Sequence, residues 1–147
     1  MRSSAVVTSL VVAALSLVGC KKEFTAASKS IPVNVSVRCV GDSVFASIRP
    51  YSINVYDDEI VEWVLDSAAT VGEIEINEKQ SGKWPFGGNL PYKAKKNEPG
   101  KGKDVLKSAK GQYEYVIETA CTMNGEPKKI LIDPDMIIIR GTRPAAE

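Results

Sequence analysis

The chain has 147 residues, of which 44% are hydrophobic and 25% are charged, a composition typical of one globular domain. Its 19 Lys and Arg against 18 Asp and Glu give a net charge of +1, so no overall basic field indicates nucleic acid as a partner. The chain contains no His. This excludes a Ser-His-Asp or Cys-His nucleophile, an imidazole zinc site and an imidazole general base.

Residues 1–19 have the pattern of a signal peptide. Arg2 is the only charge before position 21, and the uncharged stretch that follows is too short to span a bilayer. The run Leu17-Val18-Gly19-Cys20 resembles the bacterial lipobox, in which the Cys is lipidated and the peptide is cut before it. We expect a lipoprotein signal peptide over 1–19 and lipidation at Cys20; the alternative is a buried N-terminal helix with an unrelated Cys.

The lipid would anchor the mature chain stably, because two or three acyl chains bury many methylene groups. Lys21 follows the Cys where lipoproteins retained in the inner membrane have Asp, which favours the outer membrane, facing the periplasm, of a Gram-negative cell. We expect the lipidated Cys and a tether over 20–30, a folded domain over 31–140 and a flexible tail over 141–147.

Beyond the tether, apolar and polar residues alternate with the period of β-strands. Strands are expected near residues 33–39, 44–48, 53–55, 61–65, 74–76, 113–121, 130–132 and 136–139. Pro134 predicts an edge strand or a bulge between the last two, and only 103–110 suits a helical turn. The pattern predicts an all-β fold, an antiparallel Greek-key β-sandwich of seven or eight strands with one long loop insertion at 79–110.

Two stretches of the chain resemble the cupredoxin family. Residues 48–63, which run from Ile48 through Pro50, Ile53 and Val55 to Trp63, are similar to its segment aromatic-x-Pro-x-x-Ile-x-Val-x-x-Gly-Asp-x-Val-x-Trp. Ile48 replaces the aromatic residue there, and position 58 is Asp instead of Gly. Residues 111–117 and 123–125 resemble its Gly-x-Tyr-x-Tyr-x-Cys and Met-x-Gly motifs. The resemblance covers about residues 33–139, leaves 79–110 unmatched and implies a cupredoxin-like sandwich.

The departures from the family concern its copper ligands. Type 1 copper is bound by two His, one Cys and usually an axial Met. In the same alignment Ile117 occupies the position of the ligand Cys, Ala120 occupies that of the second His, and only Met123 remains. We therefore expect a sandwich with no metal or other cofactor and no blue-copper electron transfer.

Two cysteines remain after lipidation of Cys20. Cys39 and Cys121 each end an alternating apolar stripe, and the periplasm is oxidising, so we expect them to form a disulfide. The alternatives are two separate buried thiols, or a soft Cu(I) site made by Cys121 and Met123, which two sulfur ligands would hold weakly.

The insertion at 79–110 is the expected place for a binding site, since long loops on a rigid sandwich are commonly functional or disordered. Residues 81–110 contain eight Lys and two acids, whereas residues 57–78 contain eight acids and no Lys or Arg. One interpretation is that aromatic residues anchor a partner while lysines steer its acidic surface, with an envelope protein, anionic lipid or cell-wall polymer as the candidates. The other is that Trp84 and Phe86 fold back to plug the open end of the sandwich. The candidate binding residues are Trp84, Phe86, Tyr92, Lys93, Lys95 and Lys96.

Catalysis is not expected, because the Gly-Lys-Gly-Lys-Asp run at 100–104 matches neither a P-loop nor a dinucleotide-binding fingerprint. We expect a lipid-anchored cell-envelope protein with a copper-free binding or accessory domain. The alternative is a periplasmic inhibitor of an enzyme such as lysozyme, whose basic surface would face the acidic residues 57–78. A carrier of copper through sulfur ligands is the third hypothesis.

Overall fold

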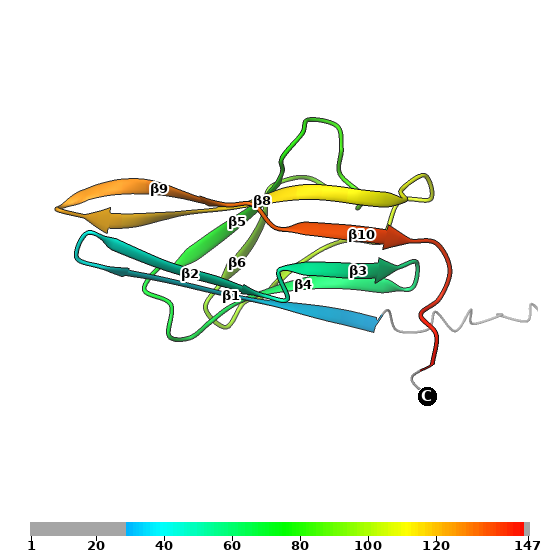
Figure 1. Cartoon of the computed structure of the whole chain (residues 1–147), viewed down its shortest axis with the longest axis horizontal. Coiled ribbons are helices and arrows are strands. Elements are labelled where there is room, and N and C mark those ends of the chain that lie inside the picture. The colour runs from blue at the N-terminus through cyan, green and yellow to red at the C-terminus, as the bar shows by residue number, and fades with distance from the viewer. Residues whose placement is uncertain (1–28, 146–147) are drawn as a thin grey trace, which may run out of the picture.

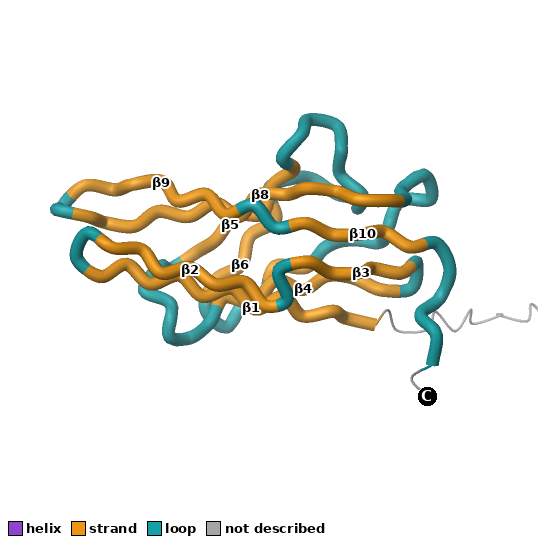
Figure 2. The backbone as a smooth tube through the Cα atoms, viewed as in Figure 1, coloured by secondary structure: helices purple, strands orange, loops and turns teal. Residues whose placement is uncertain are grey.

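The computed structural model describes residues 29–145, which form two β-sheets packed face to face (Figures 1 and 2). The strands are β1 (Lys29–Val40), β2 (Ser43–Arg49), β3 (Ser52–Tyr56), β4 (Glu59–Leu65), β5 (Glu73–Glu78), β6 (Tyr92–Lys95), β7 (Gly100–Lys101), β8 (Gly111–Met123), β9 (Glu126–Ile132) and β10 (Asp135–Ile139). One sheet has the order β2-β1-β4-β7, and the other has the order β3-β10-β8-β5-β6 with β9 beside β8. The expected all-β sandwich is confirmed.

Several sequence expectations fall on residues that the structure does not describe. The signal peptide at 1–19, the lipidation site Cys20 and the tether as far as residue 28 lie outside the described residues, as do residues 146–147. Within residues 29–145 no helix is long and apolar enough to cross a membrane.

The strand count and the pairing differ from the expectation. The sandwich has ten strands, and each sheet contains one parallel pair, β1 with β4 and β3 with β10. The expected loop insertion contains β6 and β7, which are too short for their alternation to stand out in the sequence. Residues 103–110 form no helix. Their only regular pairing is an isolated antiparallel β-bridge between Val105 and Phe86.

The core lies between the sheets and follows the predicted alternation. In β4, Val61, Trp63 and Leu65 are buried, while the residues between them are half-buried on the outer face. In β1, the valines at 33, 35 and 37 are fully buried in the same way. Burial of these apolar side chains on one face of each sheet is the main term that stabilises the sandwich.

β9 and β10 are two halves of one strand that runs along β8. Two residues separate the pairs Glu114–Asp135 and Ile117–Ile132 on both strands, so the register is unbroken and Pro134 inserts no bulge. Proline has no N–H to donate, but its carbonyl still accepts a hydrogen bond from the Tyr115 amide at 3.2 Å. The first half, β9, lies at a sheet edge as Pro134 predicted, whereas β10 gains β3 as a second neighbour.

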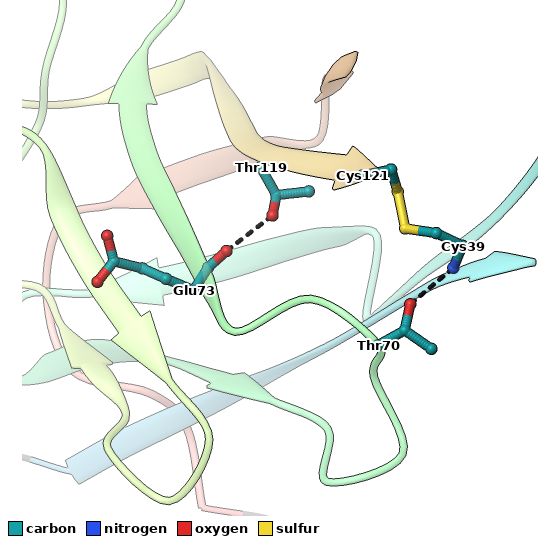
Figure 3. Close-up of a disulfide and its surroundings, with 5 residues drawn as sticks. All are labelled: Cys39, Thr70, Glu73, Thr119 and Cys121. Atoms are coloured by element: carbon teal, nitrogen blue, oxygen red, sulfur yellow. Dashed lines mark hydrogen bonds between the residues drawn. A yellow bond between two sulfur atoms is a disulfide. The ribbon is translucent and has the colours of Figure 1, made fainter. Parts of the chain in front are cut away.

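A disulfide joins the two sheets at the end of the sandwich far from Lys29 (Figures 1 and 3). Cys39 near the end of β1 is bonded to Cys121 in β8, with a Cα–Cα distance of 5.8 Å, so the predicted pairing is confirmed. The loop before β5 supports it, because the Thr70 hydroxyl accepts a hydrogen bond from the Cys39 amide at 2.7 Å. Thr119 attaches β8 to β5 by donating to the Glu73 carbonyl at 2.7 Å.

A buried ion pair fastens the opposite end, and we call it the C-terminal clasp. Glu59 is only 1% exposed, and Arg143 donates to its two carboxylate oxygens at 2.6 and 3.0 Å. The Tyr56 amide donates to the same carboxylate at 3.0 Å, while Arg143 also donates to the Asn54 carbonyl at 2.8 Å. The expected flexible tail at 141–147 is therefore held in place as far as Arg143, because this guanidinium satisfies a buried carboxylate.

Replacing Arg143 by Ala should leave the Glu59 carboxylate buried without its partner. We expect the free energy of unfolding at neutral pH to fall by about 2–4 kcal/mol, somewhat less than for a fully buried pair because the Arg143 side chain is 37% exposed. Hydrogen bonds from Arg143 hold the pKa of Glu59 below its ordinary value of 4.5. The difference between wild type and variant should therefore be present at neutral pH, where both carboxylates are charged, and disappear as the pH falls through the lowered pKa of Glu59 in the wild type.

Urea denaturation from neutral pH down to about pH 3 measures this difference. The control is the same Arg143→Ala change in a Glu59→Gln background, where no buried charge remains and the loss should be much smaller. Equal losses in the two backgrounds would contradict an ionic role for Arg143.

Candidate functional site

Five aromatic side chains, which we call the aromatic cluster, pack where the insertion folds against the sandwich. They are Trp63, Trp84, Phe86, Tyr92 and Tyr115. The ring of Trp63 lies 6.3 Å from Trp84 in a stacked arrangement and 5.9 Å from Tyr115 edge to face. Such offset-stacked and edge-to-face pairs are the favourable geometries for aromatic rings. The insertion is thus part of the core.

The cluster shows which of the two interpretations of the insertion the structure supports. Phe86 is 2% exposed and Tyr92 is 7% exposed, so both rings are packing residues and are not available to a partner. Trp84 is half-buried and donates from Nε1 to the Tyr92 hydroxyl at 3.4 Å. The aromatic residues therefore plug the sandwich, and only part of Trp84 reaches the surface.

Two polar atoms beneath Trp84 are buried without a hydrogen-bond partner among residues 29–145, Nε1 of Trp63 and the hydroxyl of Tyr115. Burial raises the pKa of Tyr115 to about 12, and the nearby Trp63 offsets only part of that effect. The phenol consequently stays protonated at physiological pH.

Trp84 and Leu106 both line two open hollows at the surface, and we call these two side chains the Trp84–Leu106 ridge. One hollow has a volume of about 630 Å³, and Glu78 and Asn89 contribute polar groups to it. The other has a volume of about 410 Å³ and is also lined by Lys83 and Lys110. Leu106 is 42% exposed. Sequence reasoning missed this residue, although Val105 packs against the core and so directs its neighbour outward.

The lysines expected to steer a partner divide into two groups. Lys93 on β6 lies 2.6 Å from Glu75 and 3.1 Å from Glu73 on β5, and Lys95 lies 3.6 Å from Glu73. The hydrogen bond from Lys93 lowers the pKa of Glu73, and the bonds to Glu75 and Glu73 raise the pKa of Lys93. Lys96, by contrast, is exposed and forms no ion pair within residues 29–145.

The charge separation in the sequence is therefore partly cancelled in space. The basic strands β6 and β7 pair with the acidic strands β5 and β4, and Lys101 also lies 3.2 Å from Glu62. The lysines near the ridge differ, since within the described chain they make no ion pair. They are Lys83, Lys103, Lys107 and Lys110. Four lysines without an ion pair in the described chain thus lie near the Trp84–Leu106 ridge, and Lys96, which follows β6, is a fifth in the insertion.

The residues that the cupredoxin resemblance places at copper-ligand positions do not fit a copper ion. Ile117 is fully buried and Ala120 is exposed, and neither side chain has a donor atom. Met123 is 7% exposed, and Cys121 is bonded to Cys39, so no thiolate is present beside the thioether while the disulfide is intact. Residues 29–145 contain no group of three or more His, Cys, Asp or Glu side chains placed to hold a metal ion.

Comparison with known proteins adds no family to this geometry. No protein-family model matches the chain, and no curated protein matches it either.

The structure predicts a graded response when the aromatic cluster and the ridge are truncated. Phe86→Ala should lower the free energy of unfolding by about 3–5 kcal/mol because it leaves a cavity in the core. Trp84→Ala should cost about 2 kcal/mol because its ring is only half-buried, and Leu106→Ala should change stability by no more than about 0.5 kcal/mol. Urea denaturation of the three variants tests this order, and a large loss for Leu106→Ala would contradict its position at the surface.

Proposed function

We propose that the protein is a lipid-anchored component of the bacterial cell envelope whose β-sandwich serves as a copper-free binding or accessory domain. The observation that carries the proposal is the run Leu17-Val18-Gly19-Cys20, preceded by Arg2 and an uncharged apolar stretch. Charge, apolar run, small residue and Cys occur in the order that a lipoprotein signal requires. The tether then leads to Lys29, where β1 begins.

The tether limits how far the domain can lie from the bilayer. Residues 20–28 can extend to about 30 Å at most, so the sandwich stays close to the membrane that holds the lipid. Lys21 after the Cys favours the outer membrane, with the domain in the periplasm. The disulfide supports an oxidising compartment, since structural disulfides are rare in the cytosol.

The Trp84–Leu106 ridge supports a binding role for the sandwich. An apolar ridge with unpaired lysines around it suits a partner that has acidic groups and some apolar surface. Leu106 can contribute to such a contact at little cost to the fold because it is already exposed. The chain resembles cupredoxins, but the side chains at its copper-ligand positions, Ile117 and Ala120, have no donor atom. This supports a role that does not involve copper.

The alternative of a lysozyme inhibitor has weaker support. It requires the acidic residues 57–78 to face a basic enzyme, but five of these acids are paired with cations of the same chain. They are Asp57, Glu59, Glu62, Glu73 and Glu75. An acidic surface neutralised in this way has little field with which to attract a basic partner.

Lipidation is tested on the protein expressed from its full sequence in a Gram-negative host. We expect the mature N-terminal peptide to begin at Cys20 with a mass that includes diacylglyceryl and acyl groups, and the protein to fractionate with the outer membrane. Cys20→Ser should abolish the lipid mass and the cleavage, whereas Cys39→Ser should leave both unchanged. A wild-type chain without lipid on Cys20 would contradict the proposal.

The binding role is tested with the purified lipidated protein as bait in detergent-solubilised envelope. We expect a partner to be recovered by wild type and by a Lys128→Glu/Lys129→Glu control, which reverses two lysines on β9 that lie away from the ridge. A Lys107→Glu/Lys110→Glu variant should lose that partner while keeping the wild-type melting temperature. Equal recovery by both variants would place the binding surface elsewhere.

A further inference from the structure

The Trp84–Leu106 ridge lies at the end of the sandwich where β1 begins. The Lys29 amide donates to the Asp58 carbonyl at 3.1 Å, and the neighbouring Asp57 lies 2.7 Å from Arg140. Arg140 in turn donates to the Leu106 carbonyl at 3.3 Å. A short series of contacts therefore connects the start of β1 with the ridge. Figure 1 shows that β1 and β8 both begin at this end, whereas β9 begins at the opposite end.

The proposed lipid anchor would hold this same end close to a bilayer. Only residues 20–28 separate Cys20 from Lys29, and they can extend to about 30 Å at most. The Cys39–Cys121 disulfide lies at the far end of the sandwich. The surfaces near Lys29, with the Trp84–Leu106 ridge among them, are therefore the ones that the tether brings nearest to the lipid headgroups.

The ridge combines exposed apolar groups with lysines that have no partner in the described chain. Lys107 follows Leu106, which is 42% exposed, and Lys110 lines one hollow together with Trp84 and Leu106. Neither lysine forms an ion pair within residues 29–145. A half-exposed indole suits the boundary between apolar and aqueous regions, because its ring is apolar and its N–H is polar.

The acids at this end leave the lysines in excess. Asp57 lies 2.7 Å from Arg140, and the buried Glu59 lies 2.6 Å from Arg143, so each of these acids is already neutralised. The exposed acids Asp58 and Asp104 are outnumbered by exposed lysines. These are Lys29, Lys103, Lys107 and Lys110.

We propose that the Trp84–Leu106 ridge contacts anionic phospholipid headgroups of the bilayer that holds the lipid anchor. The acyl chains provide the attachment, while the lysines attract the phosphates and the two apolar side chains enter the headgroup region. This contact rests on the lipidation of Cys20 proposed above, and it specifies anionic lipid as the partner of the ridge.

The tether favours lipid over a protein as the occupant. A surface held within about 30 Å of the headgroups meets them at a high effective concentration, so weak individual contacts suffice. One lipid chain or a few lysines alone give marginal membrane binding, and the two together act in concert. The contact would fix the orientation of the sandwich on the membrane rather than its attachment.

The test measures whether the ridge of the lipidated protein meets anionic lipid. The protein, expressed from its full sequence, is diluted from detergent into preformed vesicles of phosphatidylcholine with or without phosphatidylglycerol, and flotation verifies that the anchor holds it on both. Trp84 is the reporter, because the only other tryptophan, Trp63, is fully buried. We expect Trp84 emission to shift to shorter wavelength, and its quenching by acrylamide to fall, on the anionic vesicles only.

Charge reversal at the ridge should remove this response. Lys107→Glu/Lys110→Glu should give the same emission on both kinds of vesicle, because the lysines no longer attract the headgroups. Lys128→Glu/Lys129→Glu is the matched control on β9 and should respond like the wild type. Raising the salt from ~0.1 M to ~1 M should also weaken the wild-type response, since the Debye length falls from ~10 Å to ~3 Å.

A second variant verifies the source of the signal. Trp84→Phe keeps an aromatic ring at the ridge and should give no response, because the remaining Trp63 is buried. Melting temperatures close to that of the wild type show that each variant is folded. A response that persists in Trp84→Phe would come from the core and would overturn the contact at the ridge.

A failed contact is distinguishable from a failed anchor. A lipidated wild type that floats with both kinds of vesicle but shows equal Trp84 emission on them would overturn the contact and leave the anchor intact. A response that survives Lys107→Glu/Lys110→Glu would overturn it as well, as would a protein captured through these lysines by a wild type that does not respond to the vesicles. A chain without lipid on Cys20 would contradict both proposals.

Discussion

The packing of Trp63 holds together parts of the fold that are distant in the sequence. From the middle of β4 its ring contacts Tyr92 in β6 and Tyr115 in β8, so one fully buried indole joins both sheets. Its contact with Trp84 fixes where the insertion returns to the sandwich. Gly100 allows the next segment to close over this cluster, since a Cβ there would lie 2.8 Å from the Lys93 carbonyl oxygen. The position of the Trp84–Leu106 ridge therefore depends on the packing of Trp63 and its aromatic neighbours in the core beneath it.

Electrostatics organises the same region in a second way. The sequence places acidic residues on β4 and β5 and lysines on β6 and β7. Ion pairs between β5 and β6 and between β4 and β7 neutralise many of these charges. Exposed pairs of this kind add little stability, but they set which strands lie together, because a like charge opposite would be unfavourable. Four lysines of the insertion outside these pairs, Lys83, Lys103, Lys107 and Lys110, lie near the Trp84–Leu106 ridge and add positive charge there.

Local patterns predicted much of this fold and little of its pairing. The alternation in Val33–Cys39 and in Tyr113–Cys121 identified their strands, because a half-buried sheet imposes a period of two. The parallel pairs could not be predicted, since they depend on which strands meet across long separations in the chain. Glu59 and Arg143 are 84 positions apart, and neither is unusual in its local sequence. Trp84 could either anchor a partner or plug the end of the sandwich. Only its burial in the structure distinguishes these two roles, and no local sequence pattern specifies that burial.

The disulfide has a consequence for the export that we propose for this chain. Thiols remain reduced in the cytoplasm, and a bridge across 82 positions contributes about 2–4 kcal/mol to a fold whose total stability is about 5–15 kcal/mol. A precursor exported as proposed would thus be markedly less stable than the mature protein. In that proposed export, reduced Cys39 and Cys121 would leave the precursor easier to unfold during translocation, and their oxidation afterwards would link the two sheets covalently.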